Sequence, residues 1–300
     1  MSDSPGPTTA RGSFLERPHD RHVSKRAELL GGRPLPPPEL VPQPVPAGCP
    51  VGQVEAVLRR QLTEHGLGLV DLGEPMTSAH LLELGHRFGE VMPETDPAVR
   101  PNVEDGAILH LISAEGDTAD VTRQPFATSA LSLHTEGSGR PIGGQPRYIV
   151  LMCLHAGDDE NAAQTVLVPF AGVDERLRQT DREILAHVRY DRPGVPPIRR
   201  RVDGRPVFSF RDFQADTLNW VSDTDQFDAV AVRDALAALL AGMYEGGGVA
   251  RGLQWRRGLL AVLDNTYAFH GRSAAPFHDS TRHRHLKRLR ITDRSGEMAG

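Results

Sequence analysis

Short apolar runs separated by turn-forming residues constrain the fold of this 300-residue chain more than any other feature. Runs of four to seven residues are typical of buried strands and are too short for most helices. The dipeptide Asp203-Gly204 also predicts a tight turn before one of them. We therefore expect a mainly β fold. Six such runs are bounded by Gly, Pro, Asp or Asn: Ala107–Ser113, Tyr148–Leu154, Thr165–Val168, Val207–Phe210, Leu259–Leu263 and Leu286–Ile291.

Three helices are expected in addition, because apolar residues recur at helical spacing in three other segments. A short strand is expected between the first two helices, over residues 67–72. Many strands with few helices indicate a sandwich or barrel with helices packed on its outside. Each helix has a start or end signal, namely Gly66 after residues 54–62, Thr77 or Ser78 before residues 81–88, and Asp228 before residues 236–243.

The composition divides the chain into three parts. Residues 1–50 are polar and rich in proline, with eight of the chain's 24 prolines between Pro34 and Pro50. Proline at that density favours extended conformations, so this part is expected to be a flexible N-terminal arm. Apolar periodicity begins near residue 51. We expect one folded domain over residues 51–292 and a flexible tail over residues 293–300.

The composition also excludes several classes of protein. A formal net charge of −5 and an aromatic content of 5% argue against a nucleic-acid-binding surface. No apolar run approaches the roughly 18 residues of a membrane-spanning helix, and the N-terminus does not resemble a secretory signal. With only two cysteines, Cys49 and Cys153, no disulfide framework is expected. We expect a cytoplasmic protein that binds a small molecule, and the sequence leaves its oligomeric state open.

Two histidines and one glutamate form the first candidate site. His134 and Glu136 are two residues apart at the end of an expected strand, where alternate residues face the same side. His270 follows another apolar run, Leu259–Leu263, after an Asp-Asn turn. Two histidines and one carboxylate on one face of a metal ion leave three coordination positions open, as in non-haem Fe(II) oxygenases. The pattern therefore predicts an iron site at these three residues.

A basic strand follows the last of these histidines. Arg284, Leu286, Arg288 and Arg290 alternate with other residues, so one face of the strand carries three arginines. Guanidinium groups bind carboxylates through two parallel hydrogen bonds, which makes this face a candidate carboxylate-binding surface. A solvated basic strand would show the same pattern.

Together these motifs resemble those of the Fe(II)/2-oxoglutarate-dependent oxygenases, and most closely the clavaminate synthase-like branch of the taurine dioxygenase superfamily. That branch has a strand-end His-Thr-Glu, here residues 134–136, and a later Asp-Asn followed by His-Gly-Arg, here residues 264–265 and 270–272. Arginines follow 14 and 18 residues after this histidine. The resemblance covers roughly residues 50–292 and implies a double-stranded β-helix, which is a distorted jelly roll.

The resemblance implies roles for individual residues. His134, Glu136 and His270 would hold Fe(II). Arg284 would bind the distal carboxylate of 2-oxoglutarate, helped by the hydroxyl of Thr165. O₂ would be the second cosubstrate.

Substrate contacts are implied in the same way. Arg288 would bind a substrate carboxylate. Asp223 and Asp225 lie where arginine and lysine hydroxylases of this branch carry acidic residues, and would bind a basic side chain. The two aspartates would also suit an ordinary loop before a helix.

The implied activity is oxidation of an unactivated C–H bond, with 2-oxoglutarate decarboxylated to succinate and CO₂. Glu136 occupies the position that related halogenases leave to a halide, so hydroxylation is favoured over chlorination. The implied substrate is an amino acid or an amino-acid-derived small molecule of specialised metabolism, such as antibiotic biosynthesis. Desaturation or cyclisation, and a carrier-tethered or non-amino-acid substrate, are alternatives. A non-catalytic or zinc-binding jelly-roll protein is a further alternative, which would leave Arg284 unexplained.

Overall fold

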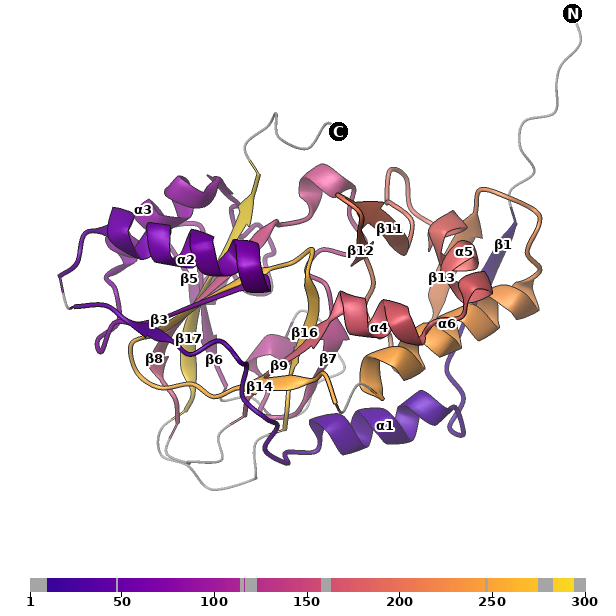
Figure 1. Cartoon of the computed structure of the whole chain (residues 1–300), viewed down its shortest axis with the longest axis horizontal. Coiled ribbons are helices and arrows are strands. Elements are labelled where there is room, and N and C mark those ends of the chain that lie inside the picture. Colours follow the sequence, from indigo (N-terminus) through magenta and orange to yellow (C-terminus); the bar gives the residue numbers. More distant parts are fainter. Residues whose placement is uncertain are drawn as a thin grey trace, which may run out of the picture.

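Two β-sheets form the centre of the molecule, as the computed structural model shows (Figure 1). The structure describes residues 10–46, 48–113, 116, 123–157, 163–245, 248–274 and 283–293. The smaller sheet contains, in spatial order, β14 (Arg251–Leu253), β9 (Thr165–Pro169), β16 (Ala268–Arg272) and β7 (Leu131–His134). The larger sheet contains β2 (Gln43–Pro44), β3 (Leu67–Asp71), β15 (Leu259–Asp264), β8 (Tyr148–His155), β17 (His285–Thr292), β6 (Ile108–Ile112) and β5 (Val103–Glu104), with β4 (Glu90–Val91) also paired to β17.

Helices cover the outside of this sandwich (Figure 1). On the larger sheet lie α2 (Val51–His65) and α3 (Ser78–Phe88), while α4 (Phe170–Arg176), α5 (Gln179–His187) and α6 (Ala229–Tyr244) gather beyond the smaller one. Short 3-10 turns occur at Arg100–Asn102, Gln124–Phe126 and Ile142–Gly144. The remaining elements are β1 (Arg11–Phe14), α1 (Arg21–Leu30), β10 (Val188–Tyr190), β11 (Arg199–Val202), β12 (Arg205–Phe208) and β13 (Leu218–Ser222).

Strand alternation divides the apolar side chains into three cores. In β8, Val150 packs with the helices α2 and α3, whereas the next residue, Leu151, packs between the sheets. On the smaller sheet, Val166 and Phe269 pack outward against α4 and α6. The resulting pair of sheets with outer helices confirms the expected jelly roll.

The three expected helices form where their signals predicted. Gly66 ends α2 in a left-handed conformation with φ of 65°. The Thr77 hydroxyl accepts a hydrogen bond from the backbone N–H of His80 at the start of α3, and the Asp228 carboxylate caps α6 through Ala231 N–H. Among the described residues, no helix has the length and apolar character needed to cross a bilayer.

The described part of residues 1–50 packs against the rest of the chain, whereas the composition predicted a flexible arm. Strand β1 pairs with β13, and Leu29 and Leu30 of α1 are buried. Arg26 of α1 donates hydrogen bonds to Glu16 and Asp212. The expected start of the domain, residue 51, coincides with the start of α2. Of the expected C-terminal tail, residues 294–300 lie outside the described residues.

An ion pair on the outer face of β17 should stabilise the protein in a pH-dependent way. The hydrogen bond from Lys287 lowers the pKa of Glu104 to about 2 from 4.5. A depressed carboxyl pKa stabilises the fold above the unfolded pKa, and this contribution is lost as the pH falls through the folded value. In urea denaturation at pH 7, Glu104→Gln should lose at most about 1 kcal/mol, because the pair is partly exposed. The loss should shrink as the pH falls from about 4.5 towards 2; a difference that is constant with pH would contradict this assignment.

Candidate active site

A cavity of about 680 Å³ between the sheets contains most of the predicted site residues. Six of the eight predicted site residues line its wall, and they come from four different strands or the ends of those strands: His134, Glu136, Thr165, His270, Arg284 and Arg288. Asp223 and Asp225 do not line it.

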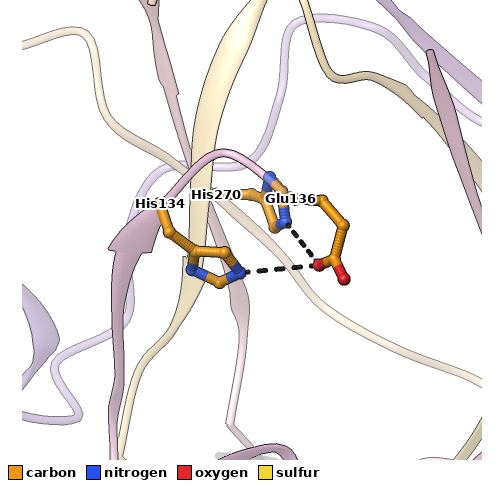
Figure 2. Close-up of side chains that lie close together, drawn as sticks. All are labelled: His134, Glu136 and His270. Carbon is orange, nitrogen blue, oxygen red and sulfur yellow. Dashed lines mark ion pairs between the residues drawn. The ribbon is translucent and has the colours of Figure 1, made fainter. Parts of the chain in front are cut away.

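The two histidines lie opposite each other on neighbouring strands. His134 ends β7, His270 lies in β16, and the two residues are direct partners in the antiparallel register. Their ring centroids are 4.4 Å apart. Glu136, two residues beyond the end of β7, turns its carboxylate towards both rings (Figure 2). The convergence predicted from sequence therefore follows from one strand pair and the turn after it.

The geometry of the three side chains fits one metal ion. The Glu136 Oε2 lies 3.8 Å from His134 Nε2 and 4.0 Å from His270 Nε2. Ligand atoms on one face of an octahedral ion, each about 2.1 Å from it, lie about 3 Å apart, so the Glu136 carboxylate would close on the two histidines by about 1 Å when an ion binds. All three ligand atoms lie within 4.8 Å of one another. Two imidazoles with one carboxylate suit Fe(II) with open coordination positions.

Protonation prepares both histidines to bind a metal. The His134 Nδ1 lies 2.8 Å from the carbonyl oxygen of Ser132, which can only accept, so Nδ1 carries the proton and Nε2 is free as a ligand. Burial, followed by the electrostatic interaction with the neighbouring His134 ring, lowers the pKa of His270 to about 3. His270 is therefore neutral at pH 7, the form that binds a metal.

Glu136 is held ionised and in position by its neighbours. Burial alone would raise its pKa, but the charge of Arg288 and the contacts with His134 and Arg290 hold it well below the ordinary value. The side chain of Asn265 binds the Glu136 backbone twice, accepting from its N–H at 2.9 Å and donating to its carbonyl at 3.0 Å. The Asp-Asn turn thus clamps the loop that carries the carboxylate.

Arg284 presents a buried positive charge to the cavity. Within the described part of the chain its guanidinium donates only to the Ser113 hydroxyl, at 3.3 and 3.4 Å, and no carboxylate pairs with it. Burial lowers the pKa of Arg284 to about 10, so it remains charged at pH 7. Thr165 lines the same cavity, and its hydroxyl accepts a hydrogen bond from the indole N–H of Trp255 at 3.0 Å. The hydroxyl proton is left to donate to a ligand.

Arg288 also faces the cavity, but acidic side chains already surround it. One Nη atom lies 2.9 Å from Glu94 and the other 3.4 Å from Glu136. Arg290, two residues further along β17, contacts the same two acids. The predicted alternation of the strand is confirmed, because Arg284, Arg288 and Arg290 all line the cavity.

Asp223 and Asp225 lie away from the cavity. Asp223 accepts a hydrogen bond from His187 Nδ1 at 2.7 Å and lies 3.9 Å from Arg189. Asp225 is exposed in the loop before α6. This arrangement matches the alternative of an ordinary loop that the sequence left open.

Neutralising these aspartates should leave substrate binding unchanged. Asp223→Asn and Asp225→Asn remove charges that the cavity does not contact, so KM for the substrate should stay within about twofold of wild type. Steady-state kinetics would check this for each variant. A KM raised tenfold or more, corresponding to about 1.4 kcal/mol, would instead place them in the substrate site.

Two further residues, which the sequence did not predict as site residues, shape the site. Glu94 follows β4 and is buried in the cavity wall, although no motif marks it. Arg272 donates hydrogen bonds to the backbone carbonyls of Gln124, Pro125 and Ser129, and so holds the cavity segment before β7. The position of Arg272 in the His-Gly-Arg motif was the one sequence feature that could have marked it as a site residue.

Comparison with known proteins agrees with this site. The family model described as taurine catabolism dioxygenase TauD, TfdA family, matches residues 33–290. No curated protein sequence matches the chain significantly. The solved structure of PvcB from Pseudomonas aeruginosa has a TM-score of 0.60 and 24% identity, and the match covers 86% of this chain and 90% of PvcB.

Two further solved structures have the same fold. An asparagine oxygenase in complex with Fe(II), 3-hydroxyasparagine and succinate has a TM-score of 0.59 and 18% identity, over 81% of this chain and 79% of that one. The non-haem iron oxygenase OrfP, in complex with Fe and alpha-ketoglutaric acid, has a TM-score of 0.56 and 18% identity, over 80% of each chain. The family match spans most of this chain, which therefore belongs to the TauD/TfdA family, the Fe(II)/2-oxoglutarate-dependent dioxygenases that its motifs predicted.

Proposed function

We propose that this dioxygenase hydroxylates an unactivated C–H bond of an amino acid or an amino-acid-derived small molecule in specialised metabolism. The observation that carries the proposal is the placement of the His134–Glu136–His270 triad and Arg284, which has no carboxylate partner among the described residues, on the wall of one cavity. When bound, Fe(II) and 2-oxoglutarate supply the oxidising power for C–H cleavage, with O₂ consumed and succinate and CO₂ released.

The residues of this chain bind and orient the reactants. His134, Glu136 and His270 would hold Fe(II), and a metal with three protein ligands would keep positions for a chelating 2-oxo acid and O₂. Arg284 suits the distal carboxylate of 2-oxoglutarate, because a buried guanidinium is stabilised when a carboxylate pairs with it. Thr165 donates to the same carboxylate from its free hydroxyl proton. Such fixed positions lower the entropic part of the barrier.

Glu136 favours hydroxylation over chlorination. A carboxylate ligand leaves no position for a halide on that side of the metal, which argues against chlorination. The similar solved proteins include one in complex with hydroxyasparagine and one, OrfP, in complex with (3S)-hydroxy-L-Arg, which supports an amino-acid-like substrate here.

Both cysteines are free, which supports a reducing, cytoplasmic location.

A substrate other than a free amino acid is a second candidate. It is favoured by the contacts of Arg288, whose guanidinium already pairs with Glu94 and Glu136 instead of facing the cavity alone. A carrier-tethered amino acid, or a molecule with no α-carboxylate, would not need this arginine.

The experiment combines anaerobic spectroscopy with a substrate screen. Fe(II) with 2-oxoglutarate should give a metal-to-ligand charge-transfer band, which a zinc protein or a non-catalytic scaffold would lack. Succinate formation is then followed across free amino acids and their carrier-tethered forms, with mass detection of products. Addition of 16 Da indicates hydroxylation, whereas loss of 2 Da indicates desaturation or cyclisation. Absence of the band in the iron-loaded protein would overturn the proposal.

A further inference from the structure

Four charged side chains form one network beside the metal position. Glu94 accepts hydrogen bonds from Nη2 of Arg288 at 2.9 Å and from Nη2 of Arg290 at 2.7 Å. The Nη1 atoms of the same arginines each lie 3.4 Å from Oε1 of Glu136. Glu94 and Glu136 therefore face each other across two guanidinium groups. The Glu94 side chain is only 3% exposed, so water screens this network little.

The two oxygens of Glu136 have different surroundings. Oε2 faces His134 and His270, at 3.8 and 4.0 Å from their Nε2 atoms. Oε1 faces the two arginines. A carboxylate that used both oxygens would take one of the three positions that the 2-oxo acid and O₂ require. The arginines hold Oε1 away from the histidines and so favour ligation through one oxygen.

Glu94 completes the charge balance of this network. Arg288 and Arg290 carry two positive charges, and Glu94 and Glu136 carry two negative charges, so the four side chains are neutral together. Without Glu94 the network would carry one positive charge next to a divalent cation. Both arginines would then turn fully to Glu136 and reduce the negative charge that it offers to a metal.

We propose that Glu94 is a positioning residue for the iron site. It acts through Arg288 and Arg290, which fix the outer oxygen of Glu136 and keep its inner oxygen directed at the metal position. In this assignment Arg288 contributes to the metal site. The inference rests on the proposed function, because it assigns a role towards the metal of that function.

The test compares Glu94→Gln with wild type and with a matched control. Glutamine keeps the size of the side chain and removes its charge. The control is Glu104→Gln. Glu104 pairs with Lys287, which lies on β17 like Arg288 and Arg290 but on the opposite face of the sheet. Anaerobic Fe(II) affinity is measured by calorimetric titration, and 2-oxoglutarate affinity is measured at saturating Fe(II) from the charge-transfer band.

Loss of Glu94 should weaken Fe(II) binding by about 10- to 100-fold, the range found for residues that orient metal ligands. Affinity for 2-oxoglutarate should not fall, because an added positive charge attracts this dianion. Glu104→Gln should bind Fe(II) like wild type. If Glu94→Gln does not fold, Arg290→Lys tests the same network, because lysine keeps the charge but cannot bridge two carboxylates as a guanidinium does.

The outcomes separate this inference from the proposed function. A wild-type protein without the charge-transfer band would overturn the proposed function. A wild-type protein with the band, together with unchanged Fe(II) affinity in Glu94→Gln or Arg290→Lys, would overturn the role of Glu94 alone. An equal loss of Fe(II) affinity in Glu104→Gln would assign the effect to general destabilisation and would also overturn that role.

Discussion

Replacing His270 with alanine should abolish turnover and weaken Fe(II) binding by more than about 100-fold. Residues that only orient metal ligands already contribute 10- to 100-fold to affinity, so removing a ligand should cost more. The variant would leave His134 and Glu136, which cannot define one face of an ion. Succinate formation and anaerobic Fe(II) titration would measure both effects, and His134→Ala and Glu136→Ala should behave in the same way.

A second histidine provides the control for this variant. His187 ends α5, lies outside the cavity and is paired with Asp223 on the surface. His187→Ala should keep Fe(II) binding and turnover near wild type. If His270→Ala retained iron-dependent succinate formation at a comparable rate, the triad would not be the metal site.

The triad was predictable because its chemistry is encoded in local spacing. His134 and Glu136 share a face at one strand end, and the later strand β16 brings His270 opposite His134 through ordinary antiparallel pairing. The β fold was predictable for a similar reason, since five strands of the central sheets, β6, β8, β9, β15 and β17, coincide with short apolar runs. Alternation along β17 likewise predicted which arginines face the cavity.

The N-terminal segment could not be placed from sequence because long-range contacts hold it. Helix α1 is strongly polar in composition, and it buries only three side chains, those of His22, Leu29 and Leu30. Its attachment depends on Arg26, which contacts Asp212, a residue 186 positions away. Pairs at such separations leave no local pattern that distinguishes this helix from a flexible arm.

The same limit applies to the electrostatics of the site. Glu94 lies 196 positions before Arg290 and belongs to no motif, so its role as a counter-charge appears only when the strands are assembled. The aspartates before α6 are the opposite case, because there a sequence pattern implied a role that the contacts in the structure do not support. By resemblance to arginine and lysine hydroxylases, acidic residues at this position were expected to bind a basic substrate side chain, yet Asp223 pairs with His187.

Replacing Arg284 with methionine should weaken 2-oxoglutarate binding by about 10- to 100-fold. A hydrogen bond to a charged group contributes about 1.5–3 kcal/mol, and about 1.4 kcal/mol corresponds to tenfold in affinity. Without cosubstrate, however, the variant should be as stable as wild type or more stable. The buried guanidinium has only a serine hydroxyl as a partner among the described residues, and a well-packed apolar chain avoids the cost of burying that charge.

Arg200 is a matched control for this substitution. It is partly buried, its pKa is also lowered to about 10 by burial, and it also donates to a serine hydroxyl, that of Ser209. It does not line the cavity. Arg200→Met should therefore change stability in a similar direction while the KM for 2-oxoglutarate stays at the wild-type value.

Thermal melting with and without 2-oxoglutarate, in the presence of Fe(II), distinguishes the two arginines. A ligand that binds the folded state raises its stability in proportion to the logarithm of its concentration over the dissociation constant. Wild type and Arg200→Met should therefore melt at a higher temperature with 2-oxoglutarate, whereas Arg284→Met should respond only at much higher concentrations. An equal shift in all three proteins would show that Arg284 does not bind the cosubstrate, and that its charge is buried for another reason.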